Sequence, residues 1–126
     1  MKIQKFNESN LTNDILHDFI EDIVEYFNVD ADGSVEVYHS QLSKYDRDEF
    51  FLEFQCQSIE KDDLEELLKI YNYIQSFDNN SVWKIFAEHV DDGLDATCFH
   101  IFIDISKFED INNDLQAKLK SDKYNL

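Results

Sequence analysis

Two parts of this chain repeat one strand pattern 48 residues apart, and this repetition limits the fold more than any other feature. Phe51–Ser58 reads FLEFQCQS, and Phe99–Ser106 reads FHIFIDIS. The stretches SVEVY, starting at Ser34, and SVWKIF, starting at Ser81, repeat at nearly the same offset. A period in this range is typical of a duplicated supersecondary unit. The sequence therefore predicts an internal repeat over 10–58 and 61–106.

The spacing of apolar residues predicts which elements make up each repeat. Apolar positions three and four apart indicate helices at Leu11–Phe27, Asp62–Phe77 and Phe108–Lys120. Alternating apolar positions indicate strands at Ser34–Ser40, Phe50–Ser58, Val82–Val90 and Cys98–Ser106. The short linkers between paired strands favour antiparallel hairpins. We therefore expect one α+β domain over 1–126, ordered α-β-β-α-β-β-α. Its four-stranded antiparallel sheet has two to three helices on one face, the C-terminal helix covering about 108–121.

The charge of the chain limits its partners. Its 28 acidic and 11 basic residues give a formal net charge of -17, and no Lys or Arg lies between Lys5 and Lys44. Such a field repels nucleic acid and anionic lipid and attracts basic protein surfaces. The eleven Phe and six Tyr argue against disorder. We expect no direct nucleic-acid or membrane partner.

The two cysteines and the first residues of the chain bear on its location. Cys56 and Cys98 fall in different predicted strands, and MKIQKFNES has no apolar signal-peptide core. Reduced thiols and a cytoplasmic location are the expectation.

Carboxylates form a stripe along the first predicted helix, opposite its apolar side. This stripe consists of Asp14, Asp18, Glu21, Asp22 and Glu25, and Asp30, Asp32 and Glu36 extend the acidic surface beyond the helix. Helical positions four apart are separated by roughly 6 Å along the axis, which is comparable to the spacing of successive phosphates on a nucleic-acid strand. One interpretation is a surface that mimics nucleic acid for a basic partner, and the other is an ordinary solvated face.

A second candidate surface is the sheet face that points away from the helices. If the helices cover the side of Phe99 to Ile105, the opposite face carries five aromatic or imidazole side chains: Tyr38, Phe51, Phe86, His100 and Phe102. Exposed aromatic residues ringed by polar groups mark interaction sites or dimer interfaces. The alternative is that a helix or loop covers them.

Metal and catalytic sites have weaker support. Asn28–His39 resembles a calcium loop of the EF-hand type through Asn28, Asp30, Asp32 and Gly33, but His39 replaces the bidentate Glu at its last position. A helix-to-strand turn explains the same residues without metal. Cys98 and His100 share a strand face, but nothing nearby supplies an oxyanion-binding loop. We expect no enzyme activity, no cofactor and no resident metal, with weak calcium binding as an alternative.

These observations favour a non-enzymatic acidic module that binds a basic protein surface. Its most concrete form is an inhibitor, of the phage anti-defence or immunity-protein type, that occludes the nucleic-acid-binding surface of another protein. The alternative is a structural protein that forms homodimers through the aromatic sheet face.

Overall fold

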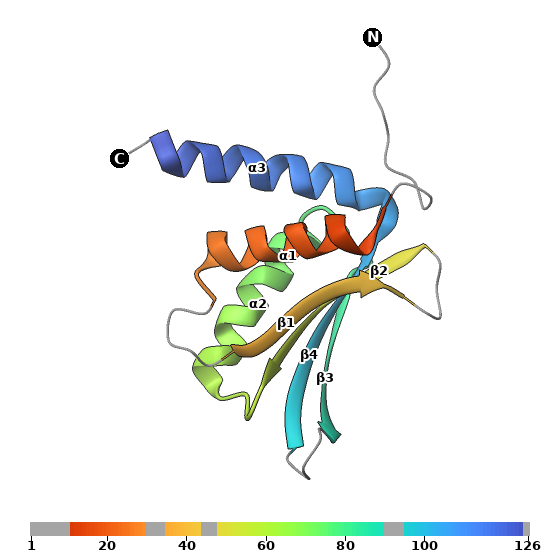
Figure 1. Ribbon diagram of the computed structural model, residues 1–126, viewed down its shortest axis with the longest axis vertical. Helices are drawn as coiled ribbons and strands as arrows, with labels where there is room; N and C mark the ends of the chain where they lie inside the picture. The colour runs from red at the N-terminus through yellow and green to blue at the C-terminus, as the bar shows by residue number, and fades with distance from the viewer. Residues whose placement is uncertain (1–10, 30–34, 44–47, 90–94, 125–126) are drawn as a thin grey trace.

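The computed structural model describes residues 11–29, 35–43, 48–89 and 95–124. Three helices, four strands and one short 3-10 helix follow one another along these ranges (Figure 1). Their order is α1 (Asn13–Phe27), β1 (Val35–Leu42), β2 (Glu49–Cys56), α2 (Lys61–Gln75), β3 (Val82–His89), β4 (Asp95–Asp104), η2 (Ile105–Lys107) and α3 (Phe108–Tyr124). The predicted α+β order is confirmed. The last predicted strand ends two residues early, because Ile105 and Ser106 belong to η2.

The four strands form one antiparallel sheet in the order β1-β2-β4-β3. The second strands of the two hairpins pair at the centre, while β1 and β3 lie at the edges. This arrangement is symmetric about the β2–β4 boundary, as a duplicated unit requires. The duplication itself stays a prediction.

The ends of α1 follow from capping chemistry. Oγ1 of Thr12 accepts a hydrogen bond from the backbone N–H of Ile15 at 3.3 Å, which satisfies one free donor of the first turn. Asn28 ends the helix in the left-handed conformation, with φ at 54°, and its N–H bonds back to Glu25 and Val24. Asn tolerates this conformation better than most non-glycine residues do.

The core lies between the three helices and one face of the sheet. That face is lined by fully buried side chains of β2 and β4, among them Phe50, Leu52, Phe54, Phe99 and Ile101. At the centre, the rings of Phe19 from α1, Phe50 from β2 and Phe108 from α3 contact one another edge to face. Their centroids are 5.1 to 6.0 Å apart, within the favourable range for aromatic pairs. The alternating apolar positions of β2 and β4 thus face the core.

Two polar contacts attach α3 to the other helices. Nε2 of Gln116 donates to Oδ2 of Asp22 on α1 at 2.6 Å, and the Tyr73 hydroxyl of α2 donates to Oδ2 of Asp114 at 2.7 Å. Figure 1 shows α3 running alongside α1 on the helical side of the sheet. The first contact joins α3 to α1, and the second joins α3 to α2.

A β-bulge in β1 changes which of its residues face the core. The register against β2 shifts between Val35 and Val37, and one extra residue reverses the alternation that follows it. Tyr38 therefore packs against the core, and His39 takes the outer face. The expectation that Tyr38 belongs to the outer surface is wrong for this reason.

Both cysteines, Cys56 and Cys98, are buried. None of the helices in the described ranges combines the length and the apolar character that crossing a bilayer requires.

Candidate functional site

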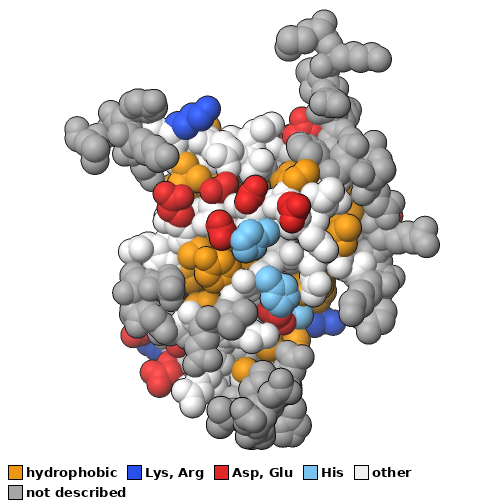
Figure 2. All heavy atoms as spheres, in the orientation of Figure 1, with side chains coloured by type: hydrophobic (Ala, Val, Ile, Leu, Met, Phe, Trp, Pro, Cys, Tyr) orange, Lys and Arg blue, Asp and Glu red, His pale blue; other side chains and the backbone are white. Residues whose placement is uncertain are grey.

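The acidic stripe of α1 lies on the solvent side of the helix. Asp14, Asp18, Glu21 and Glu25 are exposed, and we call these four the α1 stripe. Figure 2 shows acidic side chains gathered along α1 across this face of the molecule. The apolar side of α1, through Leu16, Phe19, Ile20 and Ile23, is buried in the core. The two-sided helix predicted from the sequence is thus present.

Two side chains modify the electrostatics of the stripe. Nε2 of His17 lies 3.0 Å from Oε1 of Glu21, one turn further along the helix, and both side chains are exposed. Such an exposed pair contributes little to stability in water. Asp22 is half-buried and occupied by its hydrogen bond from Gln116. It belongs to the α1–α3 contact rather than to the α1 stripe.

The structure does not describe the remaining predicted acidic side chains. Asp30 and Asp32 lie outside the described residues, and so does the side chain of Glu36. The calcium hypothesis depends on Asp30, Asp32 and Gly33, so it stays a prediction. Its last position, His39, is engaged in a contact with Glu53 on the sheet. Elsewhere in the described part of the chain, no group of three His, Cys, Asp or Glu side chains is placed to hold a metal ion.

The outer sheet face brings four of the predicted residues together. Phe51 stacks on His100 with ring centroids 4.7 Å apart, and Phe86 meets His100 edge to face at the same separation. Phe102 contacts both Phe51 and His100 at 5.8 Å. We call these four residues the aromatic cluster. The imidazole of His100 sits at its centre and is only 12% exposed.

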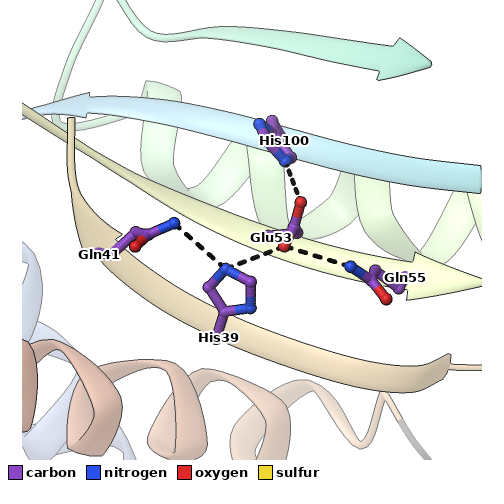
Figure 3. A network of polar contacts seen from close by, with 5 residues as sticks. All are labelled: His39, Gln41, Glu53, Gln55 and His100. Atoms are coloured by element: carbon purple, nitrogen blue, oxygen red, sulfur yellow. Dashed lines mark hydrogen bonds and ion pairs between the residues drawn. The ribbon is translucent and has the colours of Figure 1, made fainter. Parts of the chain in front are cut away.

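Beside this cluster lies a buried carboxylate that the sequence analysis did not identify. Glu53 of β2 is opposite His39 of β1 and His100 of β4 in the sheet register, and its side chain is 8% exposed. Its Oε1 lies 2.9 Å from Nε2 of His39, and its Oε2 lies 2.5 Å from Nε2 of His100. Figure 3 shows the two imidazoles reaching Glu53 from the strands on either side.

The protonation of this network follows from its geometry. An ionised carboxylate only accepts hydrogen bonds, so Nε2 of each histidine carries the donated proton. Nε2 of His39 then cannot accept from Nε2 of Gln41, 3.5 Å away, and the shorter contact to Glu53 prevails. Gln55 adds a further donor to Oε1 at 3.4 Å.

The pKa of Glu53 reflects these donors. Hydrogen bonds from His100 and then His39 hold the pKa of the Glu53 carboxyl far below its usual value of 4.5, although burial alone would raise it. Both carboxylate oxygens are occupied by these donors. The network therefore links strands β1, β2 and β4 through one carboxylate. With its low pKa, this carboxylate is a weak proton acceptor.

The same bulge explains why the sequence analysis missed this network. With regular alternation His39 would face the core, away from Glu53. A buried Glu on a strand flanked by aromatic residues is itself an indirect signal, because a carboxylate is rarely buried without a partner. The partner, however, depends on cross-strand register.

Comparisons with protein-family models, with curated proteins and with solved structures found no match to this chain.

Proposed function

We propose that this protein is an acidic, non-enzymatic module that binds the basic surface of another protein through the α1 stripe. In its most specific form it is an inhibitor, of the anti-defence or immunity type, that occludes a nucleic-acid-binding surface. The observation that carries the proposal is the row of four exposed carboxylates on α1, a helix whose sequence contains no Lys or Arg.

The placement of the stripe supports recognition by a partner. α1 is fixed by its buried apolar side and by the contact of Asp22 with Gln116. Carboxylates on a rigid helix lose little freedom when they bind, which favours affinity. Their combined field speeds association with a cationic surface, and salt weakens that attraction.

The aromatic cluster gives less support to the alternative function, a structural protein that forms homodimers through the outer sheet face. Phe51, His100 and Phe102 are at least half-buried and occupied by one another. Such residues stabilise the sheet face and cover Glu53. The more exposed apolar side chains lie on β3.

A panel of purified nucleases and DNA-binding proteins tests the proposal. The stripe variant D14N/D18N/E21Q/E25Q removes four charges, and the control variant D62N/E65Q/E66Q/D110N removes four from α2 and α3. We expect the wild type and the control to inhibit at least one panel member, and the stripe variant to lose this inhibition. Equal inhibition by all three proteins would refute the assignment to α1.

A further inference from the structure

Strand β3 exposes apolar side chains on both faces of the sheet. All four large apolar side chains that remain exposed among the described residues belong to it: Val82 at 50%, Trp83 at 39%, Ile85 at 40% and Phe86 at 38%. The register with β4 places Trp83 and Ile85 on the helical face, and Val82 and Phe86 on the outer face. Exposed apolar side chains grouped in this way mark an interaction surface.

The backbone of β3 has room for another strand. In the described part of the chain β3 pairs with β4 alone and forms an edge of the sheet. A long edge strand with exposed apolar residues is a template for pairing with another chain. The opposite edge strand, β1, has no exposed large apolar side chain among its described residues. The β3 edge is thus the place where the sheet can grow.

The charge of β3 indicates which chain can approach it. Two copies of a protein with a net charge of -17 repel over most of their surfaces. Positions 81 to 87 contain no acid, and Lys84 is the only Lys or Arg in the four strands. Two residues beyond Phe86 the sequence has Glu88, so cation and anion are arranged symmetrically about Phe86.

We propose that β3 pairs antiparallel with β3 of a second copy, with the two-fold axis at Phe86. This register places position 84 opposite position 88 of the other copy, which makes two Lys–Glu pairs. An axis at Lys84 would oppose the two lysines, and an axis at Ile85 would place Lys84 opposite Phe86. Opposite charges directly across a strand pair stabilise it, and like charges destabilise it. The result is an eight-stranded antiparallel sheet, β1-β2-β4-β3 continued by its symmetric copy.

Exchanging the charges of Lys84 and Glu88 tests whether the partner is a second copy and whether the two β3 strands pair in this register. Sedimentation equilibrium from roughly 1 µM to 1 mM covers the range of weak interfaces. We expect the wild type to pass from 15.0 kDa to twice that mass. Lys84→Glu or Glu88→Lys alone turns two opposite-charge pairs into two like-charge pairs, and we expect either to raise the dissociation constant about tenfold. The double variant K84E/E88K restores the pairs and dimerises like the wild type.

A matched exchange on α2 serves as the control. Lys61 and Glu65 form an exposed pair with 4.0 Å between Nζ and Oε1, so K61E/E65K leaves dimerisation unchanged. Wild-type protein that stays at the monomer mass throughout overturns the proposal. Single variants that dimerise like the wild type overturn it too, and so does a double variant as weak as the singles. Circular dichroism checks that each variant is folded.

Discussion

The imidazole of His39 reaches the buried carboxylate of Glu53 from the neighbouring strand, with 2.9 Å between Nε2 and Oε1. The contact exists because the bulge in β1 turns His39 to the outer face. The imidazole of His100, on the strand at the other side, contacts the second carboxylate oxygen through Nε2. A charge is therefore held on the sheet beneath aromatic rings.

Replacing Glu53 by Gln keeps the shape of the side chain and removes its charge. We expect a loss of about 2 kcal/mol in the free energy of unfolding, because two charge-assisted hydrogen bonds are weakened in a buried site. Urea denaturation at neutral pH measures this loss. Glu65→Gln, on the exposed side of α2, provides the comparison and changes stability by less than about 0.5 kcal/mol. Equal stability of the two variants would contradict the role given to Glu53.

The same carboxylate predicts a pH dependence. Its pKa is lowered in the folded state relative to its usual 4.5. The stabilisation is therefore fully present above about pH 4.5 and is lost as the pH falls below that value, because the unfolded state takes up the proton first. We expect the difference in stability between wild type and Glu53→Gln to shrink as the pH falls from 5 toward 3. A difference that does not change with pH would show that Glu53 titrates normally.

The environment of Tyr73 predicts that the stability of the fold depends on pH in the alkaline range. Burial, followed by the hydrogen bond to Asp114, raises the pKa of the Tyr73 phenol far above its usual 10. The stabilisation is present below pH 10 and is lost as the pH rises through that value. We expect Tyr73→Phe to cost about 1 kcal/mol at pH 7 and to flatten the loss of stability above pH 10. Thermal unfolding between pH 7 and pH 11 measures both effects. Parallel curves for the two proteins would rule out this assignment.

Replacing each of two buried serines by Ala is expected to change the free energy of unfolding in opposite directions. The buried hydroxyl of Ser40, which is 6% exposed, has no hydrogen-bond partner among the described residues. Oγ of Ser81, which is 4% exposed, donates to the carbonyl of Phe102 at 2.7 Å. Ser40→Ala removes an unsatisfied polar group, so we expect a gain of up to about 1 kcal/mol. Ser81→Ala removes this buried hydrogen bond, and we expect a loss of about 1 kcal/mol. Chemical denaturation measures the free energy of unfolding of both variants. A decrease in both would contradict the account of Ser40.

The sequence predicts the fold well because the fold depends on periodicity. The apolar positions of α1 recur with the helical period, and Phe99, Ile101 and Ile103 alternate cleanly along β4. These patterns identify the elements and their order, whereas the face that the helices cover follows only from the structure. They are properties of neighbouring residues along the chain, which a single sequence contains.

The outer sheet face was less predictable because it depends on register. One extra residue between Val35 and Val37 exchanges the faces of Tyr38 and His39, and the apolar pattern of β1 does not reveal the bulge. The pairing of Glu53 with His39 and His100 also requires the strand order β1-β2-β4. Neither fact is local in sequence.

Capture of a partner from the native host tests the central claim most directly. Immobilised wild type, the stripe variant D14N/D18N/E21Q/E25Q and the control variant D62N/E65Q/E66Q/D110N are compared at low and high salt. We predict that wild type and control retain the same nucleic-acid-binding protein, that high salt releases it, and that the stripe variant does not retain it. Retention of that partner by the stripe variant at the wild-type level would contradict the assignment of the binding surface to α1.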